Sequence, residues 1–180
     1  MIHEDYKEKL HQFNSSKKYE GEMKTLIEFM DPKSYETILD YGAGTGFMAE
    51  HIRASKGSRV YAYDVHGDYY EGDPFYFRTE LYFSVDKIYL MHSFAHIADP
   101  YRLLITLRDK FLNPGGSIYI LTPNREWIDE NKKPDYIPDP TVIKHYTSSD
   151  IYDICEDLDA SNIRIKYIGN GERLMIRLKF

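Results

Sequence analysis

The chain has a single cysteine, Cys155, no long apolar run and no excess of basic residues. One cysteine cannot close an internal disulfide, which excludes a disulfide framework and suits a reducing cytoplasm. No stretch approaches the ~18 apolar residues of a membrane-spanning helix, and residues 1–5 do not resemble a signal peptide. The net charge of −6 disfavours a nucleic-acid partner, because binding to phosphates requires a basic face. We therefore expect a cytoplasmic protein that contacts neither membranes nor nucleic acids.

The length of 180 residues is that of one ordinary domain. Such a chain buries roughly 70% of the surface that it exposes when unfolded. We expect a single domain, 1–180, present as a monomer or a homodimer. Its expected parts are an N-terminal helical segment (1–33), a ligand-binding core (34–124), a loop or lid (125–146), and a last helix with a hairpin (147–180).

Apolar runs of strand type alternate with segments of helical periodicity along the chain. A parallel sheet with helices on both sides follows from this alternation, and a Gly169-Asn170-Gly171 turn predicts a closing antiparallel hairpin. The fold class is thus α/β: a Rossmann-like, doubly wound, mostly parallel sheet with a C-terminal antiparallel hairpin. Strands are expected at 37–39, 59–63, 85–91, 117–121, 163–168 and 173–179. Helices are expected between Ser15-Ser16 and Asp31-Pro32, from Phe47 to about Ser55, after Asp99 and after Thr147.

Two segments predict irregular structure. Residues 66–82 are too few for a full helix between two strands, so a helix there is shortened or missing. Residues 125–144 contain Pro134, Pro138 and Pro140 among many charges, which predicts a long functional loop. Asn113-Pro114-Gly115-Gly116 is expected to end a helix and turn into the strand at 117–121.

The most informative motif runs from Asp40 to Gly46 and contains glycines at 42, 44 and 46. Closely spaced glycines allow a sharp turn and a close approach of the backbone to a ligand. Asp64 ends the next apolar run, and an acid at that point is typical of a site that binds ribose hydroxyls.

The glycine spacing differs from that of a dinucleotide site. A pyrophosphate-binding turn reads G-x-G-x-x-G, whereas here Phe47 stands where that pattern requires its third glycine. The carboxylate of Asp40 would repel a pyrophosphate and would suit a sulfonium or ammonium cation.

These residues resemble motif I of the class I S-adenosylmethionine-dependent methyltransferases. The resemblance continues in order through 85–100, through Leu112-Asn113-Pro114-Gly115-Gly116, through Thr122-Pro123-Asn124 and through His145-Tyr146-Thr147. Together these motifs cover about residues 36–160 and are similar to those of ubiquinone-biosynthesis and sugar O-methyltransferases. The resemblance implies the class I methyltransferase fold, with S-adenosyl-L-methionine as cofactor and S-adenosyl-L-homocysteine as product.

The resemblance also implies the residues that bind the cofactor. Asp40 and the glycine turn would face its methionine part, and Asp64 would bind the ribose diol. The stretch 64–85 is short, so the adenine contact has only Glu80 and Leu81 as positional candidates. The full set implied is Asp40, Tyr41, Gly42, Ala43, Gly44, Gly46, Phe47, Asp64, Val65, Glu80, Leu81 and His92.

One departure from the family concerns metal. The quinone enzymes carry a Glu-x-x-Glu-His run associated with a divalent ion, whereas the matching positions here are His92, Ala95 and His96. His92 and His96 would share one face of a helical turn, but a zinc site needs at least a third ligand. We therefore expect no metal.

Histidines are the candidate bases for a hydroxyl acceptor, since imidazole titrates near neutral pH. His92 and His96 follow a strand whose carboxyl end faces the ligand in such sheets. His145 ends the proline-bearing loop. Each of them could equally be a packing residue. Tyr19 and Trp127 could close over the site or belong to ordinary packing.

Three functions are compatible with these residues. The first is methylation of a small polar molecule, with O-methylation of a saccharide or nucleotide-linked substrate favoured. The second is a catalytically inactive subunit that binds S-adenosylmethionine and serves in regulation or assembly. Nucleic-acid methylation is the third, and it lacks the N/D-P-P-Y/F motif, because His92-Ser93-Phe94-Ala95 stands at that place.

Overall fold

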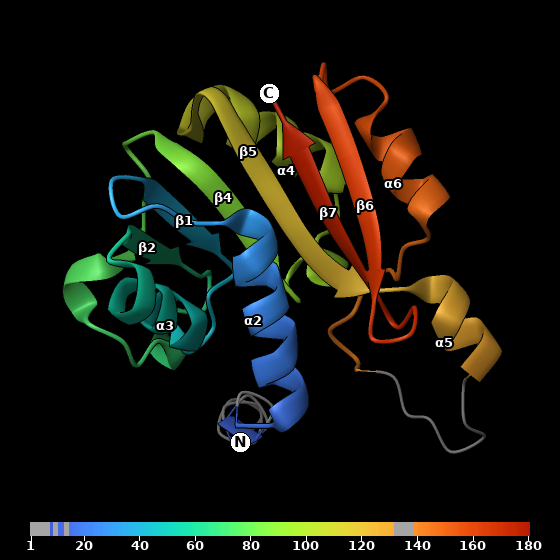
Figure 1. The fold of residues 1–180 in the computed structure, drawn as a ribbon, viewed down its shortest axis with the longest axis horizontal. Helices are drawn as coiled ribbons and strands as arrows, with labels where there is room; N and C mark the ends of the chain where they lie inside the picture. Colours follow the sequence, from blue (N-terminus) through green and yellow to red (C-terminus); the bar gives the residue numbers. More distant parts are fainter. Residues whose placement is uncertain (1–7, 9–10, 13–14, 132–138) are drawn as a thin grey trace. The chain divides into compact units, whose positions relative to one another are not determined.

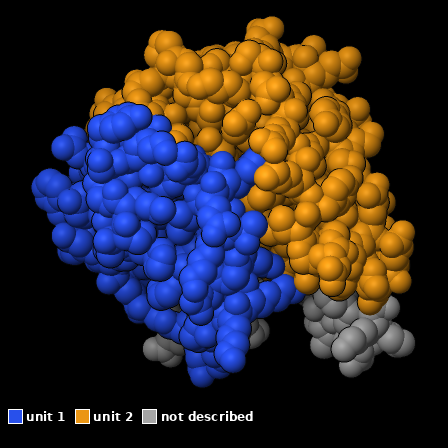
Figure 2. Space-filling model, viewed as in Figure 1, with its two compact units in different colours: residues 1–81 blue, residues 82–180 orange. Residues whose placement is uncertain are grey.

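A computed structural model describes residues 8, 11–12, 15–131 and 139–180 of the chain. The chain divides into two compact units, residues 1–81 and 82–180, coloured separately in Figure 2. Within the described residues, no helix is both long and apolar enough to cross a membrane.

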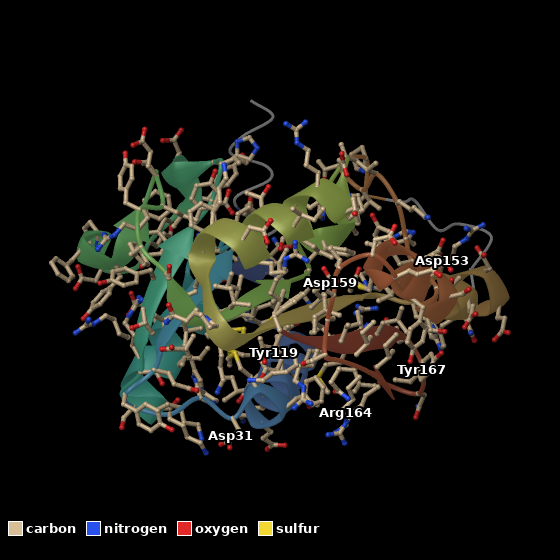
Figure 3. All side chains as sticks on the ribbon, turned by 90° about the horizontal axis from the view of Figure 1, so that it is seen from above. Asp31, Tyr119, Asp153, Asp159, Arg164 and Tyr167 are labelled. Atoms are coloured by element: carbon tan, nitrogen blue, oxygen red, sulfur yellow. The ribbon has the colours of Figure 1, made fainter. Side chains whose placement is uncertain are left out.

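Unit 1 begins with helix α2, Lys17–Met30, which starts and ends where the sequence predicts. The Ser16 side chain accepts a hydrogen bond from the Tyr19 amide, and Asp31, labelled in Figure 3, ends the helix in the left-handed conformation. The apolar side chains of Met23, Leu26 and Met30 are buried. The helix therefore presents one apolar face, as its periodicity indicates.

Three parallel strands and one long helix complete unit 1 (Figure 1). Strand β1 is flanked by β2, and β2 by β3. Two 3-10 turns replace the usual helix before β3, so the expectation of a shortened or missing helix is confirmed. The elements are β1 Thr37–Tyr41, α3 Phe47–Lys56, β2 Arg59–Tyr63, η1 Gly67–Tyr69, η2 Pro74–Tyr76 and β3 Phe77–Arg78.

In unit 2 the strands follow the order β4-β5-β7-β6, with β4 and β5 parallel and the last two antiparallel to their neighbours. The predicted hairpin is confirmed, because Gly169, Asn170 and Gly171 all adopt the positive φ that its turn requires. The elements are β4 Val85–Met91, η3 Phe94–His96, α4 Pro100–Thr106, η4 Leu107–Phe111, β5 Leu112–Pro123, α5 Arg125–Asn131, α6 Ser148–Cys155, β6 Asn162–Ile168 and β7 Arg173–Lys179.

Two expectations about unit 2 are wrong in part. Residues 125–131 form a helix, α5, and only the segment after it lacks regular structure; Pro134 and Pro138 lie outside the described residues. Asn113–Gly116 follows the end of the helical segment at Phe111, as expected, but it lies inside β5 instead of before the strand. There the register with β4 shifts from Val85↔Leu112 to Lys87↔Ser117, so this segment is an irregularity of a longer strand.

Candidate cofactor and acceptor site

The glycine turn connects β1 to α3 within unit 1. Gly42, Gly44 and Gly46 have φ of 82°, 53° and 80°, a conformation that side chains with a Cβ rarely adopt. The turn is fixed to the end of β2, because the Gly42 and Ala43 amides donate to the Tyr63 carbonyl over 2.8 and 3.1 Å. The backbone of this turn is therefore held in place next to Asp64.

Asp64 is oriented by two backbone donors. The Gly44 amide donates to Oδ2 and the His66 amide to Oδ1, each over 2.8 Å. An ionised carboxylate offers about four lone-pair sites. Two acceptor positions thus remain for donors from a ligand, which is the number that a vicinal diol supplies.

Asp40, at the end of β1, has only 3% of its surface exposed. Its carboxylate lies near the phenol of Tyr19 from α2. Burial raises the pKa of Tyr19 far above its ordinary value, and the carboxylates of Asp40 and Glu22 add to that effect. The Tyr19 ring also contacts Phe47, with centroids 6.1 Å apart. The structure thus brings α2, the strand-ending acid and the start of α3 together.

The remaining candidates for cofactor contact in unit 1 differ in their surroundings. Tyr41 stacks on Tyr63 with centroids 5.0 Å apart, and burial, followed by Tyr63 and Asp64, raises the pKa of Tyr41. Val65 is 74% exposed directly after Asp64. Glu80 is exposed and Leu81 half-buried, in the irregular stretch that follows β3.

In unit 2, His92 follows β4 with φ of 61°, and its amide donates to the Leu121 carbonyl over 2.9 Å. The 3-10 turn η3 starts only at Phe94. The helical turn in which His92 and His96 would share a face does not form, because His92 is itself left-handed and lies before η3. Among the described residues no three His, Cys, Asp or Glu side chains cluster closely enough to hold a metal ion.

His96 is oriented by the segment that precedes His145. Its Nδ1 lies 3.0 Å from both the carbonyl oxygen and the hydroxyl oxygen of Thr141. The Thr141 hydroxyl donates its one hydrogen to Asp139 over 2.7 Å. Both oxygens therefore accept from Nδ1–H, so Nδ1 carries the proton and Nε2 keeps its lone pair.

The main chain holds this segment against η3. The amides of Ile143 and Lys144 both donate to the Ala95 carbonyl, over 2.9 and 3.2 Å. Sequence reasoning did not identify Asp139 or Thr141 as site residues. The only local signal was the Asp-x-Thr spacing, which is typical of a side-chain-capped turn and does not indicate which histidine it orients.

His145 lies close to His96 and to two charged side chains. Burial lowers the pKa of His145, and the charge of Arg173 lowers it further, while Asp129 opposes them. The imidazole of His145 is therefore neutral at pH 7. Sequence reasoning placed Arg173 only in the strand expected at 173–179.

The lowered pKa predicts how stability depends on pH. Unfolded His145 titrates near 6.5 and the folded side chain below that, so the unfolded state binds more protons in the window between them. The contribution of His145 to stability is present above about pH 6.5 and is lost as the pH falls through that window. Urea unfolding at pH 5 to 7.5 should show a smaller loss toward acid for His145→Gln than for the unchanged protein. Equal losses would contradict this account.

Comparison with solved structures defines the class of fold. A chain of the complex between the Haloferax volcanii Trm112 methyltransferase activator and the putative methyltransferase is similar with a TM-score of 0.71 at 17% identity, covering 87% of this chain and 86% of that one. A SAM-dependent methyltransferase from Archaeoglobus fulgidus is similar with a TM-score of 0.70 at 16% identity, covering 94% of this chain and 96% of that one. A SAM-dependent methyltransferase from Aquifex aeolicus is similar with a TM-score of 0.63 at 20% identity, covering 87% of each chain. The expected Rossmann-like class I methyltransferase fold, a mostly parallel sheet with C-terminal antiparallel strands, is confirmed.

The sequence itself identifies the family. A family model described as a methyltransferase domain matches residues 12–165, and the chain belongs to that family. It is an S-adenosylmethionine-dependent methyltransferase. No curated protein matches the sequence.

The residues present in unit 1 fit this cofactor. The three glycines of the turn at Gly42–Gly46 carry no Cβ that would keep a ligand away from the backbone. Asp64 retains two acceptor positions for the ribose diol. The buried acid Asp40 supplies negative charge suited to a sulfonium cation.

Proposed function

We propose that the chain transfers a methyl group to a hydroxyl of a small polar molecule, a saccharide or a nucleotide-linked sugar. The observation that carries the proposal is the fixed tautomer of His96, whose Nε2 lone pair is available to take a hydroxyl proton. When bound, S-adenosylmethionine supplies a methyl group that is already activated.

The chain's own residues then have three tasks. Asp64, with Asp40 and the glycine turn, holds the cofactor through ribose hydrogen bonds and negative charge. Nε2 of His96 accepts the proton that the acceptor hydroxyl loses, and Thr141 keeps Nδ1–H directed away from the acceptor. Asp139 accepts the hydrogen of the Thr141 hydroxyl and so fixes the polarity of that pair.

A pocket in unit 1 supports the substrate class. It measures about 250 Å³ and is lined by Phe47, a residue that is 45% exposed, and by polar side chains that include His11, Ser15 and Glu71. A sugar carries hydroxyls at its edge and C–H groups on its faces, so it can bind such polar groups and pack on an aromatic ring at once.

Labelled methyl donor tests the proposal. We expect label to enter nucleotide-linked or free sugars when the protein is incubated with panels of sugars, phenols, amines, RNA and protein. Mass spectrometry of the product should place the methyl group on oxygen. Labelling confined to another panel would overturn the substrate class while leaving the methyltransferase assignment unaffected.

A second candidate is the cofactor-binding regulatory or assembly subunit that does not catalyse. The complex from Haloferax volcanii that contains the Trm112 methyltransferase activator supports only the partner-binding part of this candidate, because a protein of this fold occurs there with a partner. It predicts binding of S-adenosylhomocysteine, no label in any panel of acceptors, and a stable complex in a pull-down from source cells. The cytoplasmic location and the monomeric or homodimeric state remain sequence-based predictions.

A further inference from the structure

The segment between β2 and β3 contacts the glycine turn through Tyr70. A Cβ added at Gly46 would come within 2.7 Å of Tyr70 Cδ2 and closer still to Cε2. Gly46, the third glycine of motif I, therefore leaves room for the ring of Tyr70. Tyr70 lies in the stretch where two 3-10 turns replace a helix.

Three groups fix the Tyr70 hydroxyl. Arg53 donates to it over 3.2 Å, and the hydroxyl lies 3.3 Å from the Asp73 carbonyl and 3.5 Å from Glu50 Oε1. Glu50 and Arg53 belong to α3 and form an ion pair with each other. Arg53 also donates to the Val60 carbonyl of β2. The ring on Gly46 is thus anchored to the first turns of α3 and, through Arg53, to the sheet.

A backbone hydrogen bond adds a second contact beside the first. The Glu71 amide donates to the Thr45 carbonyl over 3.0 Å, and the Asp73 amide donates to Glu50 Oε1 over 2.8 Å. The peptide between Thr45 and Gly46 is therefore contacted both by the Glu71 amide, at the Thr45 carbonyl, and by the Tyr70 ring, at Gly46. Gly44, whose amide orients Asp64, directly precedes Thr45 in the chain.

We propose that Tyr70 is a positioning residue for the cofactor: its ring, packed on Gly46, keeps the turn in the shape that S-adenosylmethionine requires. The ring limits the conformations of a glycine-rich stretch that would otherwise be free to move, and a turn held in its binding shape loses less entropy when a ligand arrives. The proposal rests on the cofactor assignment. It adds a residue to the cofactor site, because Tyr70 lies outside motif I.

Calorimetric titration with S-adenosylhomocysteine tests the proposal. Tyr70→Ala should raise the dissociation constant about tenfold, the effect expected when support behind a binding turn is removed. Tyr70→Phe keeps the ring and should stay within about threefold of the unchanged protein. If the unchanged protein does not bind the ligand, the cofactor assignment fails; if it binds and Tyr70→Ala binds equally well, the role of Tyr70 is refuted.

Tyr76 provides the matched control on the same segment. Its ring lies under Arg53, 4.3 Å from ring centroid to guanidinium, and near Tyr61. Tyr76→Ala therefore removes an aromatic contact of the same segment and keeps the Tyr70 ring at Gly46. Because Arg53 also donates to the Tyr70 hydroxyl, Tyr70→Phe controls for an indirect effect through Arg53. Both alanine variants should lower the temperature of thermal unfolding, whereas only Tyr70→Ala should change the dissociation constant for S-adenosylhomocysteine. Equal changes in the dissociation constant would show a structural role alone.

A double-mutant cycle separates Tyr70 from the strain at Gly46 itself. Gly46→Ala should weaken binding because the new methyl group displaces the ring. The combined variant with Tyr70→Ala should then bind no more weakly than the worse single variant, since both changes remove one contact. Additive losses would mean that Gly46 and Tyr70 act independently and would overturn the proposal. If Tyr70→Ala does not fold, Tyr70→Leu enters the cycle in its place.

Discussion

Replacing Asp64 with asparagine should raise the dissociation constant for S-adenosylhomocysteine about a hundredfold, since a hydrogen bond to a charged group contributes about 1.5–3 kcal/mol. The carboxylate accepts from the Gly44 and His66 amides and has two acceptor positions left for a diol. An asparagine side chain has one acceptor oxygen, so its amide nitrogen would face either a backbone donor or the ribose. Titration calorimetry measures the change directly.

Asp68 is the matched control for this substitution. It is an exposed acid in η1, on the same segment, and Asp68→Asn changes the net charge by the same amount. Binding by that variant should equal that of the unchanged protein. Retained affinity in Asp64→Asn, or an equal loss in both variants, would contradict the ribose role of Asp64.

Removing the imidazole of His96 should lower kcat for the labelled acceptor by about a hundredfold to ten-thousandfold, the usual contribution of a general base. The dissociation constant for S-adenosylhomocysteine should stay unchanged, because His96 is proposed to act on the acceptor and no cofactor contact is assigned to it. Turnover of His96→Ala is measured with the acceptor found in the labelling experiment. Added imidazole should restore part of that turnover.

Two further variants make the His96 prediction specific. Thr141→Val removes the hydroxyl beside Nδ1 but keeps the carbonyl acceptor, so it should lower kcat less than His96→Ala does. His51→Ala, on α3, removes an imidazole elsewhere and should leave kcat unchanged. Full turnover by His96→Ala would show that another group takes the proton, or that the acceptor atom needs no base.

Local chemistry made much of the fold predictable from the sequence. Ser16 and Asp99 each begin a helix where a side-chain oxygen meets free backbone amides, and Thr147 with Asp150 forms the capping box. The glycine turn and Asp64 are likewise close in sequence, and their geometry follows from motif I. Such features depend on neighbours within a few residues of one another.

The features that escaped prediction depend on distant partners. The tautomer of His96 is set by Thr141, which lies 45 residues further along the chain. The contact of Tyr70 with Gly46 exists because the chain between β2 and β3 folds back on α3. Helix α5 was missed because the prolines that follow it suggested a loop, although they stand beyond its last residue, Asn131.

The two outermost strands, β3 and β6, bear on how the protein avoids intermolecular β-sheet formation. Strand β3 pairs through only two residues, which is too short a template for another chain to extend. Strand β6 is longer, but Arg164 and Lys166 alternate along it as exposed cations, and Figure 3 shows Arg164 directed away from the ribbon. Brevity at one edge and like-charge repulsion at the other would each hinder the stacking of copies into aggregates.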